Sequence, residues 1–237
     1  TDSELWNAEV RYEWYFGRDQ RLSVAGFYKA IDNPIEAYTS ISDSSINTSY
    51  ANAPKATLYG AEVELQKYVP LDNMSDGAFW ASRRLVLIGN YTYTQSKIKV
   101  GAGDTTVIDG NRQDAANYFF DGAPLTGQSD HLVNVQIGLE DTDRLSQQTL
   151  LLTYASPRVT SRGPSGQPDL LEKPGVSLDF IARQGLMLLG KEIELKFEAR
   201  NLTGRTYKEV QESGSNRIYF NRYKLGRTFS LSASLKF

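Results

Sequence analysis

The dominant pattern along the chain is an alternation of apolar and polar residues with a period of two. It is sharpest near the C-terminal end, where Ile193, Leu195, Phe197 and Ala199 alternate with Glu192, Glu194, Lys196, Glu198 and Arg200. A period of two predicts a β-strand with one apolar and one polar face. No stretch of comparable length shows the spacing of a helix. The pattern therefore predicts an all-β protein.

The same alternation recurs along the chain and predicts about nine strands. They cover residues 7–14, 21–31, 57–69, 84–97, 131–140, 145–154, 176–183, 192–200 and 229–237. Many of these are longer than the ~5–6 residues typical of a globular sheet. A strand of a transmembrane barrel needs ~9–11 residues to cross the hydrocarbon. The lengths favour an antiparallel transmembrane β-barrel.

The connections between the predicted strands fall into two classes that take turns. Tight connections lie at residues 17–20, 141–144 and 185–191, with a medium-length exception at 70–82. Long polar connections lie at residues 38–54, 100–129 and 156–174. Short turns at one end and long loops at the other are typical of outer-membrane barrels. A soluble β-sandwich such as a lectin gives no reason for this asymmetry, so it is the weakest alternative.

The loop lengths also predict an orientation. If Phe237 ends on the periplasmic side, the long loops lie outside the cell and the first strand begins at the outer surface. Closed bacterial barrels have an even number of strands, and open sheet edges are unstable in lipid. We therefore expect residues 1–237 to be the C-terminal part of a larger barrel, with its N-terminal strands and plug domain outside these residues.

Composition agrees with a barrel and excludes some partners. The chain has 14 Tyr, 10 Phe and 3 Trp, which suit the aromatic girdles at the two membrane interfaces. Mean hydropathy is negative, as expected when lipid-facing and lumen-facing residues alternate. The formal net charge is −2, so nothing indicates nucleic-acid binding. Trp6, Tyr12, Trp14, Tyr91 and Tyr93 are interpreted as girdle residues.

Candidate chemistry is sparse. The chain has no cysteine and a single histidine, His131, whose alternation places it in a lipid-facing row. The absence of cysteine excludes a thiolate metal site. Without a second histidine, a Ser-His triad or a histidine-rich metal site would need residues outside this chain. We expect no catalytic residue, no metal site and no cofactor. An outer-membrane protease or lipase is the enzymatic alternative, and it needs a histidine-containing group that the chain does not display.

The C-terminal region resembles a known family. Its runs FEARNLTGRTYKEVQ and YFNRYKLGRTFSLSASLKF look like the last two strands of TonB-dependent outer-membrane transporters, and YGAEVEL at residues 59–65 resembles barrel strands of that family. The resemblance implies that Asn201, Leu202, Thr203 and Tyr207 lie on the penultimate strand. It implies that Gly226, Arg227, Phe229 and Ser230 open the final crossing.

The end of the chain is similar to the signal that outer-membrane assembly machinery reads. The residues that carry this similarity are Phe229, Leu231, Leu235 and Phe237. We expect the assembly machinery to be a partner of the protein.

The resemblance implies a plugged barrel of about 22 strands. It further implies a receptor that binds a scarce solute at its extracellular loops and imports it with energy from the TonB complex, reached through the plug. The solute class stays open between a ferric siderophore, cobalamin, an oligosaccharide and an aromatic compound. Outer-membrane lipid is the other implied partner. The alternative is a passive porin or a structural barrel, for which no energy coupling is needed.

The loop at residues 101–128 is the best ligand-binding candidate. Aromatic and charged side chains occur together there, as on recognition surfaces. The candidate residues are Arg112, Asp114, Asn117, Tyr118, Phe119 and Phe120. The competing interpretation is an ordinary loop that folds its own aromatic residues beneath itself. The later loop with Arg158, Arg162 and Asp169 is interpreted mainly as turns, because it is rich in Gly and Pro.

Overall fold

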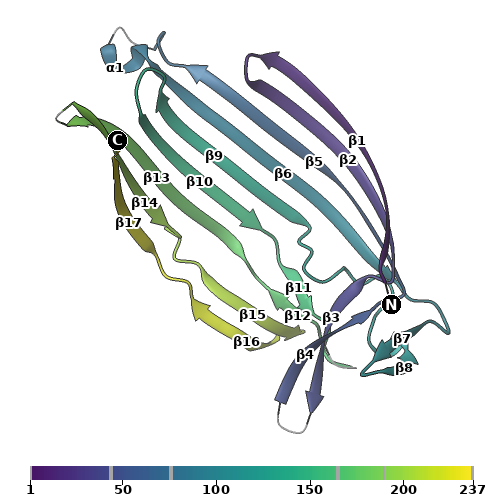
Figure 1. Ribbon diagram of the computed structural model, residues 1–237. Helices are drawn as coiled ribbons and strands as arrows, with labels where there is room; N and C mark the ends of the chain where they lie inside the picture. The colour runs from purple at the N-terminus through teal and green to yellow at the C-terminus, as the bar shows by residue number, and fades with distance from the viewer. Residues whose placement is uncertain (1, 43–44, 75–76, 164–165, 189, 236–237) are drawn as a thin grey trace.

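The main structural element is a nine-stranded antiparallel sheet. The computed structural model describes residues 2–42, 45–74, 77–163, 166–188 and 190–235. Figure 1 shows the strands side by side in one curved sheet, with β1 and β17 at its edges. In sheet order they are β1 (Glu4–Gly17), β2 (Gln20–Asp32), β5 (Lys55–Pro70), β6 (Arg83–Lys99), β9 (His131–Asp141), β10 (Ser146–Ala155), β13 (Gly175–Leu188), β14 (Lys191–Arg200) and β17 (Thr228–Leu235).

These strands confirm the all-β prediction and coincide with the nine stretches that alternation marked. The two longest, β5 and β6, have 16 and 17 residues. Within the described ranges, no helix is long and apolar enough to cross a membrane. Closure of the sheet into a barrel, and a total of about 22 strands, stay predictions.

The strand register sorts the side chains onto two faces. On one face, called here the polar face, Arg21 of β2 lies 3.1 Å from Glu64 of β5, and Arg183 of β13 lies 2.7 Å from Glu194 of β14. On the other, the apolar face, Val135 of β9 stands beside Leu152 of β10. Charged residues cross-link one face while aliphatic side chains cover the other. This is the arrangement of a barrel wall between water and lipid.

His131 lies on the apolar face, as its alternation predicted. Its Nδ1 is 2.9 Å from the hydroxyl of Tyr91, and its ring also packs against Tyr93. Aromatic and amphipathic rings of this kind gather at membrane interfaces. The contact places His131 in a cluster of aromatic rings on the apolar face.

The two ends of the sheet differ as the loop lengths predicted. The connections β1–β2, β9–β10 and β13–β14 are tight, and β5–β6 carries the four-residue helix α1 (Ala78–Ala81). This is the short-turn end. At the opposite, long-loop end, β2–β5, β6–β9, β10–β13 and β14–β17 are joined by long segments that form small sheets of their own.

One strand extends further than expected. The sequence predicted a turn at residues 185–191, but β13 continues to Leu188. Gly185, the first residue of the predicted turn, pairs with Glu194 inside the strand. A Cβ there would lie 3.1 Å from the Cβ of Leu145, so glycine allows a close approach of two chain segments rather than a reversal.

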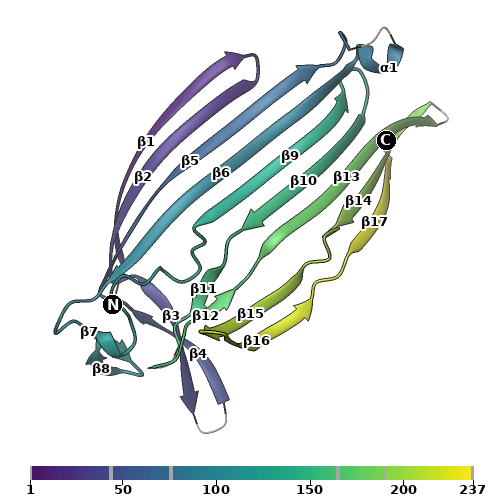
Figure 2. The same cartoon turned by 180° about the vertical axis from the view of Figure 1, so that it is seen from behind.

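Small sheets extend the structure beyond the strands of the large sheet at the long-loop end. They consist of the hairpin β3 (Ile35–Ser42) with β4 (Ser45–Asn52), the hairpin β7 (Thr105–Ile108) with β8 (Asn111–Asp114), and the sheet of β11 (Arg158–Ser161), β12 (Leu170–Glu172), β15 (Thr206–Ser213) and β16 (Asn216–Lys224). The four-stranded sheet lies beyond the ends of β10, β13, β14 and β17 and repeats their order (Figures 1 and 2).

The expectation that residues 201–203 and Tyr207 lie on the penultimate strand is wrong. β14 ends at Arg200, because Asn201 has a φ of 53°, a left-handed conformation that Asn tolerates and a strand does not. The Asn201 side chain accepts a bond from Arg205 N at 2.8 Å and donates to Gly226 O. Tyr207 lies on β15. The segment is a joint between the large sheet and the four-stranded sheet.

The second motif of the family resemblance, which begins at Gly226 and Arg227, completes this joint. Arg227 donates from Nε to the carbonyl of Leu202 at 3.0 Å, and β17 begins directly afterwards at Thr228. Gly226 and Arg227 therefore precede the last crossing, as expected. The two motifs that carry the resemblance meet in space although 25 residues separate Asn201 from Gly226.

Candidate functional site

Three of the long connections meet at the long-loop end and form the loop assembly. They are the first loop (residues 33–54), the second loop (residues 100–130) and the third loop (residues 156–174). The first loop contains β3 and β4, the second β7 and β8, and the third β11 and β12. Figure 2 shows the β3–β4 hairpin reaching from β2 toward β11 and β12, across the long-loop end of the sheet.

An apolar cluster joins the first two loops to the sheet. Tyr38 of the first loop and Phe119 of the second are 3% and 1% exposed. They pack with Ile98 of β6 and Ala56 of β5, which are direct register partners. Alternate residues of a strand share a face, so Ala56 lies on the same face of β5 as Glu62, which is the polar face. Ile98, its register partner on β6, lies on that face too. The loop assembly therefore covers the polar face of the sheet at this end.

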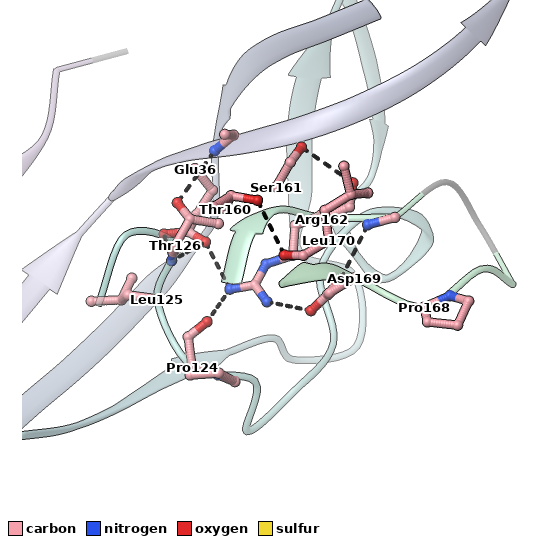
Figure 3. Close-up of polar contacts among 12 residues, drawn as sticks. Glu36, Pro124, Leu125, Thr126, Thr160, Ser161, Arg162, Pro168, Asp169 and Leu170 are labelled. Atoms are coloured by element: carbon pink, nitrogen blue, oxygen red, sulfur yellow. Dashed lines mark hydrogen bonds and ion pairs between the residues drawn. The ribbon is translucent and has the colours of Figure 1, made fainter. Parts of the chain in front are cut away.

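A buried ionic centre joins all three loops. Arg162 of the third loop is completely buried, and its guanidinium lies 2.8 Å from the Glu36 carboxylate of the first loop. The same guanidinium lies 2.7 Å from Asp169 and donates to the carbonyl of Pro124 in the second loop. Figure 3 shows the Arg162 side chain at the centre of these contacts. One side chain thus connects three segments.

Backbone bonds reinforce the ionic centre. Arg162 N donates to Ala37 O at 2.9 Å, and Thr39 N donates to Arg162 O at 2.8 Å. These bonds form a parallel bridge between Tyr38 and Arg162. The hydroxyls of Thr39 and Ser161 lie 2.8 Å apart beside it. The third loop is therefore held against β3 by its main chain as well as by its arginine.

Glu36 is the electrostatically unusual group of the centre. Burial raises the pKa of the Glu36 carboxyl above its usual value, and the neighbouring Arg162 and the amide of Thr126 oppose that rise. Thr126 N donates to both carboxylate oxygens, at 3.1 and 3.2 Å. In the described part of the chain, Arg162 Nε has no hydrogen-bond partner. A buried ion pair of this kind fixes geometry at a considerable desolvation cost.

Half of the predicted ligand-binding set packs the second loop together. Phe119 is in the apolar cluster, and Tyr118 packs edge-to-face on Tyr38 with ring centres 5.8 Å apart. Asp114 accepts a bond from Ala116 N at 3.0 Å and so caps the 3-10 helix η1 (Ala115–Asn117). These residues behave as the alternative interpretation expected, with the loop folding its aromatics beneath itself.

The other three residues lie on the surface, and Asp114 is exposed as well. Arg112 on β8 and Asn117 in η1 are exposed, and the Phe120 side chain is 47% exposed. A hollow of about 350 Å³ is lined by Asp114, Phe120 and Asp121 together with residues 100–103, and its lining does not include Arg112 or Asn117. The structure thus brings polar and aromatic surface groups to the rim of one hollow.

The ionic centre had no local signal in the sequence. Arg162 and Asp169 fall in a segment that was interpreted as turns, and Glu36 lies 126 positions away from Arg162. Neither charge is part of a recognisable spacing. Their partnership depends on how the β3–β4 hairpin crosses the sheet.

The predicted assembly signal lies on one edge of the large sheet. Phe229 and Leu231 of β17 share the apolar face with Leu235, and Phe229 and Leu231 are 60% and 75% exposed. Phe237 lies outside the described residues. Recognition by assembly machinery stays a prediction.

The architecture of the large sheet defines the class of protein. Long antiparallel strands with one apolar and one charged face, tight turns at one end and folded loops at the other, form the wall of an outer-membrane β-barrel. The family model for TonB dependent receptor-like β-barrels matches residues 3–202, and the chain belongs to this family. It is a family of outer-membrane transport receptors and not of enzymes.

The match also shows where the family signature lies. It includes residues 59–65, but it ends at Leu202 and so contains little of the C-terminal region that first suggested the family. Comparison with curated proteins and with solved structures finds no match to this chain.

Proposed function

We propose that the chain forms part of the wall and mouth of a receptor that binds a scarce solute outside the cell and imports it with TonB-derived energy. The observation that carries the proposal is the loop assembly. Its three loops are locked around Arg162, while Arg112, Asn117 and Phe120 stay on its surface. Binding sites need such preorganisation, because an already ordered loop loses less entropy when a solute binds.

In this proposal the long-loop end faces the outside of the cell and the polar face lines the lumen. Phe120 provides an apolar contact in the hollow beside η1, whose lining also contains Asp114 and Asp121. Arg112 and Asn117 provide hydrogen-bond donors on the exposed surface of the same loop. Such a mixture suits a solute with both polar and apolar parts, as a ferric siderophore, cobalamin or an oligosaccharide has.

The rest of the receptor would complete the lumen. In the described sheet, β1 and β17 each pair with one neighbour, which leaves an edge that lipid cannot satisfy. Further strands would pair with these edges. A plug would then contact the charged rows of the polar face, such as Arg11, which lies 3.7 Å from both Glu62 and Glu64.

The test is solute binding and uptake by the intact receptor in outer membranes, with a panel of ferric siderophores, cobalamin and oligosaccharides. The double variant Arg112→Ala/Phe120→Ala is expected to weaken binding of the recognised solute about tenfold, equivalent to ~1.4 kcal/mol. The matched control is Arg18→Ala, because Arg18 is an arginine of the short-turn end whose side chain is 98% exposed.

Two results would change the proposal. If the double variant bound every solute as the unchanged receptor does, the exposed surface of the second loop would not be the binding site. If uptake continued after the inner membrane was de-energised, the protein would be a passive porin, the alternative that the sequence left open.

A further inference from the structure

The apolar face carries a hollow on strands β1, β2, β5 and β6. Its volume is about 550 Å³, and its lining is mainly apolar. Val10, Gly26, Ala61 and Tyr93 form one cross-strand row through it, and the next row contains Ala8, Tyr28 and Tyr59. Small residues on neighbouring strands therefore leave a depression, and tyrosines stand around it.

Gly26 shows that this depression is open space. A Cβ built on Gly26 would meet no atom within 4 Å, and its φ is not in the left-handed range. The neighbouring Gly60 is different, because a Cβ there would lie 2.0 Å from the carbonyl oxygen of Tyr93. Close packing explains Gly60 and does not explain Gly26. Glycine at position 26 keeps the hollow empty of side chains.

Lysines lie beyond the hollow on the same face, toward the long-loop end. Lys97 and Lys99 follow Tyr93 at even spacing on β6, so they share its face, and Lys99 pairs in register with Lys55. Four residues separate Tyr93 from Lys97, which is about 13 Å along a strand. Lys55 lies 3.9 Å from Asp32, whereas no ion pair holds Lys97 or Lys99 within the described part of the chain.

We propose that this surface is a binding site for one phosphorylated, acylated lipid of the outer leaflet. An acyl chain fills the hollow around Gly26, and the lipid phosphates lie against Lys97 and Lys99. The site is continuous with the lipid-facing wall, and the lysines can reach the headgroup region with their charged ends while their stems stay in apolar surroundings. The inference rests on the proposed orientation, with the long-loop end outside the cell, and not on which solute the receptor imports.

The hollow is tested by filling it. The intact receptor is purified in neutral detergent and incubated with bisphosphorylated lipid A, and retained lipid is measured by native mass spectrometry. Gly26→Trp is expected to weaken retention about tenfold, because the indole occupies the space of the acyl chain. The matched control is Gly89→Trp, on the same face of β6, where a Cβ would approach only the Asn134 carbonyl oxygen, at 4.0 Å.

The role of the lysines is tested by comparing the binding of phosphorylated and dephosphorylated lipid A. The unchanged receptor is expected to retain bisphosphorylated lipid A in preference to the dephosphorylated form. Lys97→Gln/Lys99→Gln is expected to reduce binding of the phosphorylated form about thirtyfold, at roughly 1 kcal/mol per lysine, and to leave the other form unchanged. Lys67→Gln, on the same face near the short-turn end, is the control.

Several outcomes would overturn the proposal. One is equal retention by the Gly26→Trp and Gly89→Trp receptors, since the hollow would then hold no acyl chain. Another is equal binding of the two forms of lipid A by the unchanged receptor, which would exclude a phosphate site. A receptor dimer that is lost in Gly26→Trp, with no lipid retained, would mean that a second copy covers this surface.

Discussion

The large sheet and the loop assembly are stabilised in different ways. In the sheet, residues 55–66 of β5 each pair with β2 on one side and with β6 on the other. The same contact is repeated along every interior strand. In the loop assembly, three segments distant in sequence meet at Arg162, which contacts Glu36, Asp169 and Pro124. Its stability is concentrated in a few side chains.

The difference teaches how the two regions tolerate change. A repeated backbone ladder loses little when one side chain is altered, provided that the side chain keeps the polarity of its face. A region that depends on one buried arginine and one small apolar cluster can open as a unit. The following experiments test this contrast, from the largest expected effect to the smallest.

The strongest test is Arg162→Met. The change leaves the Glu36 carboxylate buried beside Thr126 without its cation, and breaking a buried pair costs about 3–5 kcal/mol. Amide exchange at Thr39 and Thr126 is expected to become fast, while amides of β5 and β6 stay protected. Hydrogen exchange with mass spectrometry measures both regions in one sample.

The matched control for this variant is Lys173→Met in the same loop. Lys173 also has an acidic partner, Glu212 at 2.7 Å, but the two side chains are 31% and 25% exposed. Partly exposed pairs contribute ~0–1 kcal/mol, so exchange at Thr39 should change little. If Arg162→Met deprotected the sheet together with the loops, the two regions would be one cooperative unit and the contrast would be wrong.

Neighbouring aromatic residues of the second loop sharpen the comparison. Phe119→Ala removes a side chain that is 1% exposed, so it is expected to lower the free energy of opening the loop assembly by about 3 kcal/mol. Phe120→Ala alters a side chain that is 47% exposed and should change it by less than about 0.5 kcal/mol. Limited proteolysis within residues 101–128 measures the opening. Equal cleavage rates for the two variants would contradict the packing of Phe119.

The stability of the large sheet is expected to depend on the polarity of the side chains on each face. Val135→Arg and Leu231→Arg place a charge on the apolar face, at a cost of about 2–4 kcal/mol near mid-membrane. Ser232→Arg places the same charge on the polar face and should be close to neutral. The folded fraction in lipid vesicles, measured by heat-modifiable gel mobility against urea, compares the three. Equal folded fractions would mean that the faces are wrongly assigned.

The smallest effect concerns pH and Glu36. Its pKa in the folded loops is raised above the usual value, so the folded state binds the proton more tightly than the open state. The Glu36 contribution to loop stability should therefore increase as pH falls from the raised pKa to about 4.5, while Arg162 keeps its pair with Asp169. The free energy of opening is obtained from amide exchange rates corrected for their intrinsic pH dependence. In Glu36→Gln this free energy should no longer increase as pH falls. An unchanged trend would assign it to another group.

The fold could be read from the sequence because its signal is local and repeated. Each stretch of period-two alternation, such as Ile193 to Ala199, predicts both a strand and the face on which each side chain lies. Nine such stretches correspond to the nine strands of the large sheet. Prediction failed where a residue type has two uses. Gly185 allows a close approach inside β13 rather than a turn, and Asn201 ends β14 rather than continuing it.

The candidate site was predicted in part. The second loop was the expected recognition loop, yet nothing local distinguished Phe119, which is buried, from Phe120, which is exposed. Adjacent residues on an irregular loop have no fixed periodicity, so their directions depend on the segments that cover them. The assembly residues Phe229 and Leu231 and the solute-binding role of Arg112 and Asn117 stay predictions for experiment.

The sequence by itself determined the nine strands of the large sheet, their two faces, the long and short connections and the membership of an outer-membrane wall, because alternation acts between near neighbours. Only the tertiary structure decided that Glu36 meets Arg162 across 126 positions, that the loops cover the polar face, and that small residues of three strands leave a hollow around Gly26. These features arise from strand register and loop crossing. Both are set by contacts between distant segments, which no local pattern records.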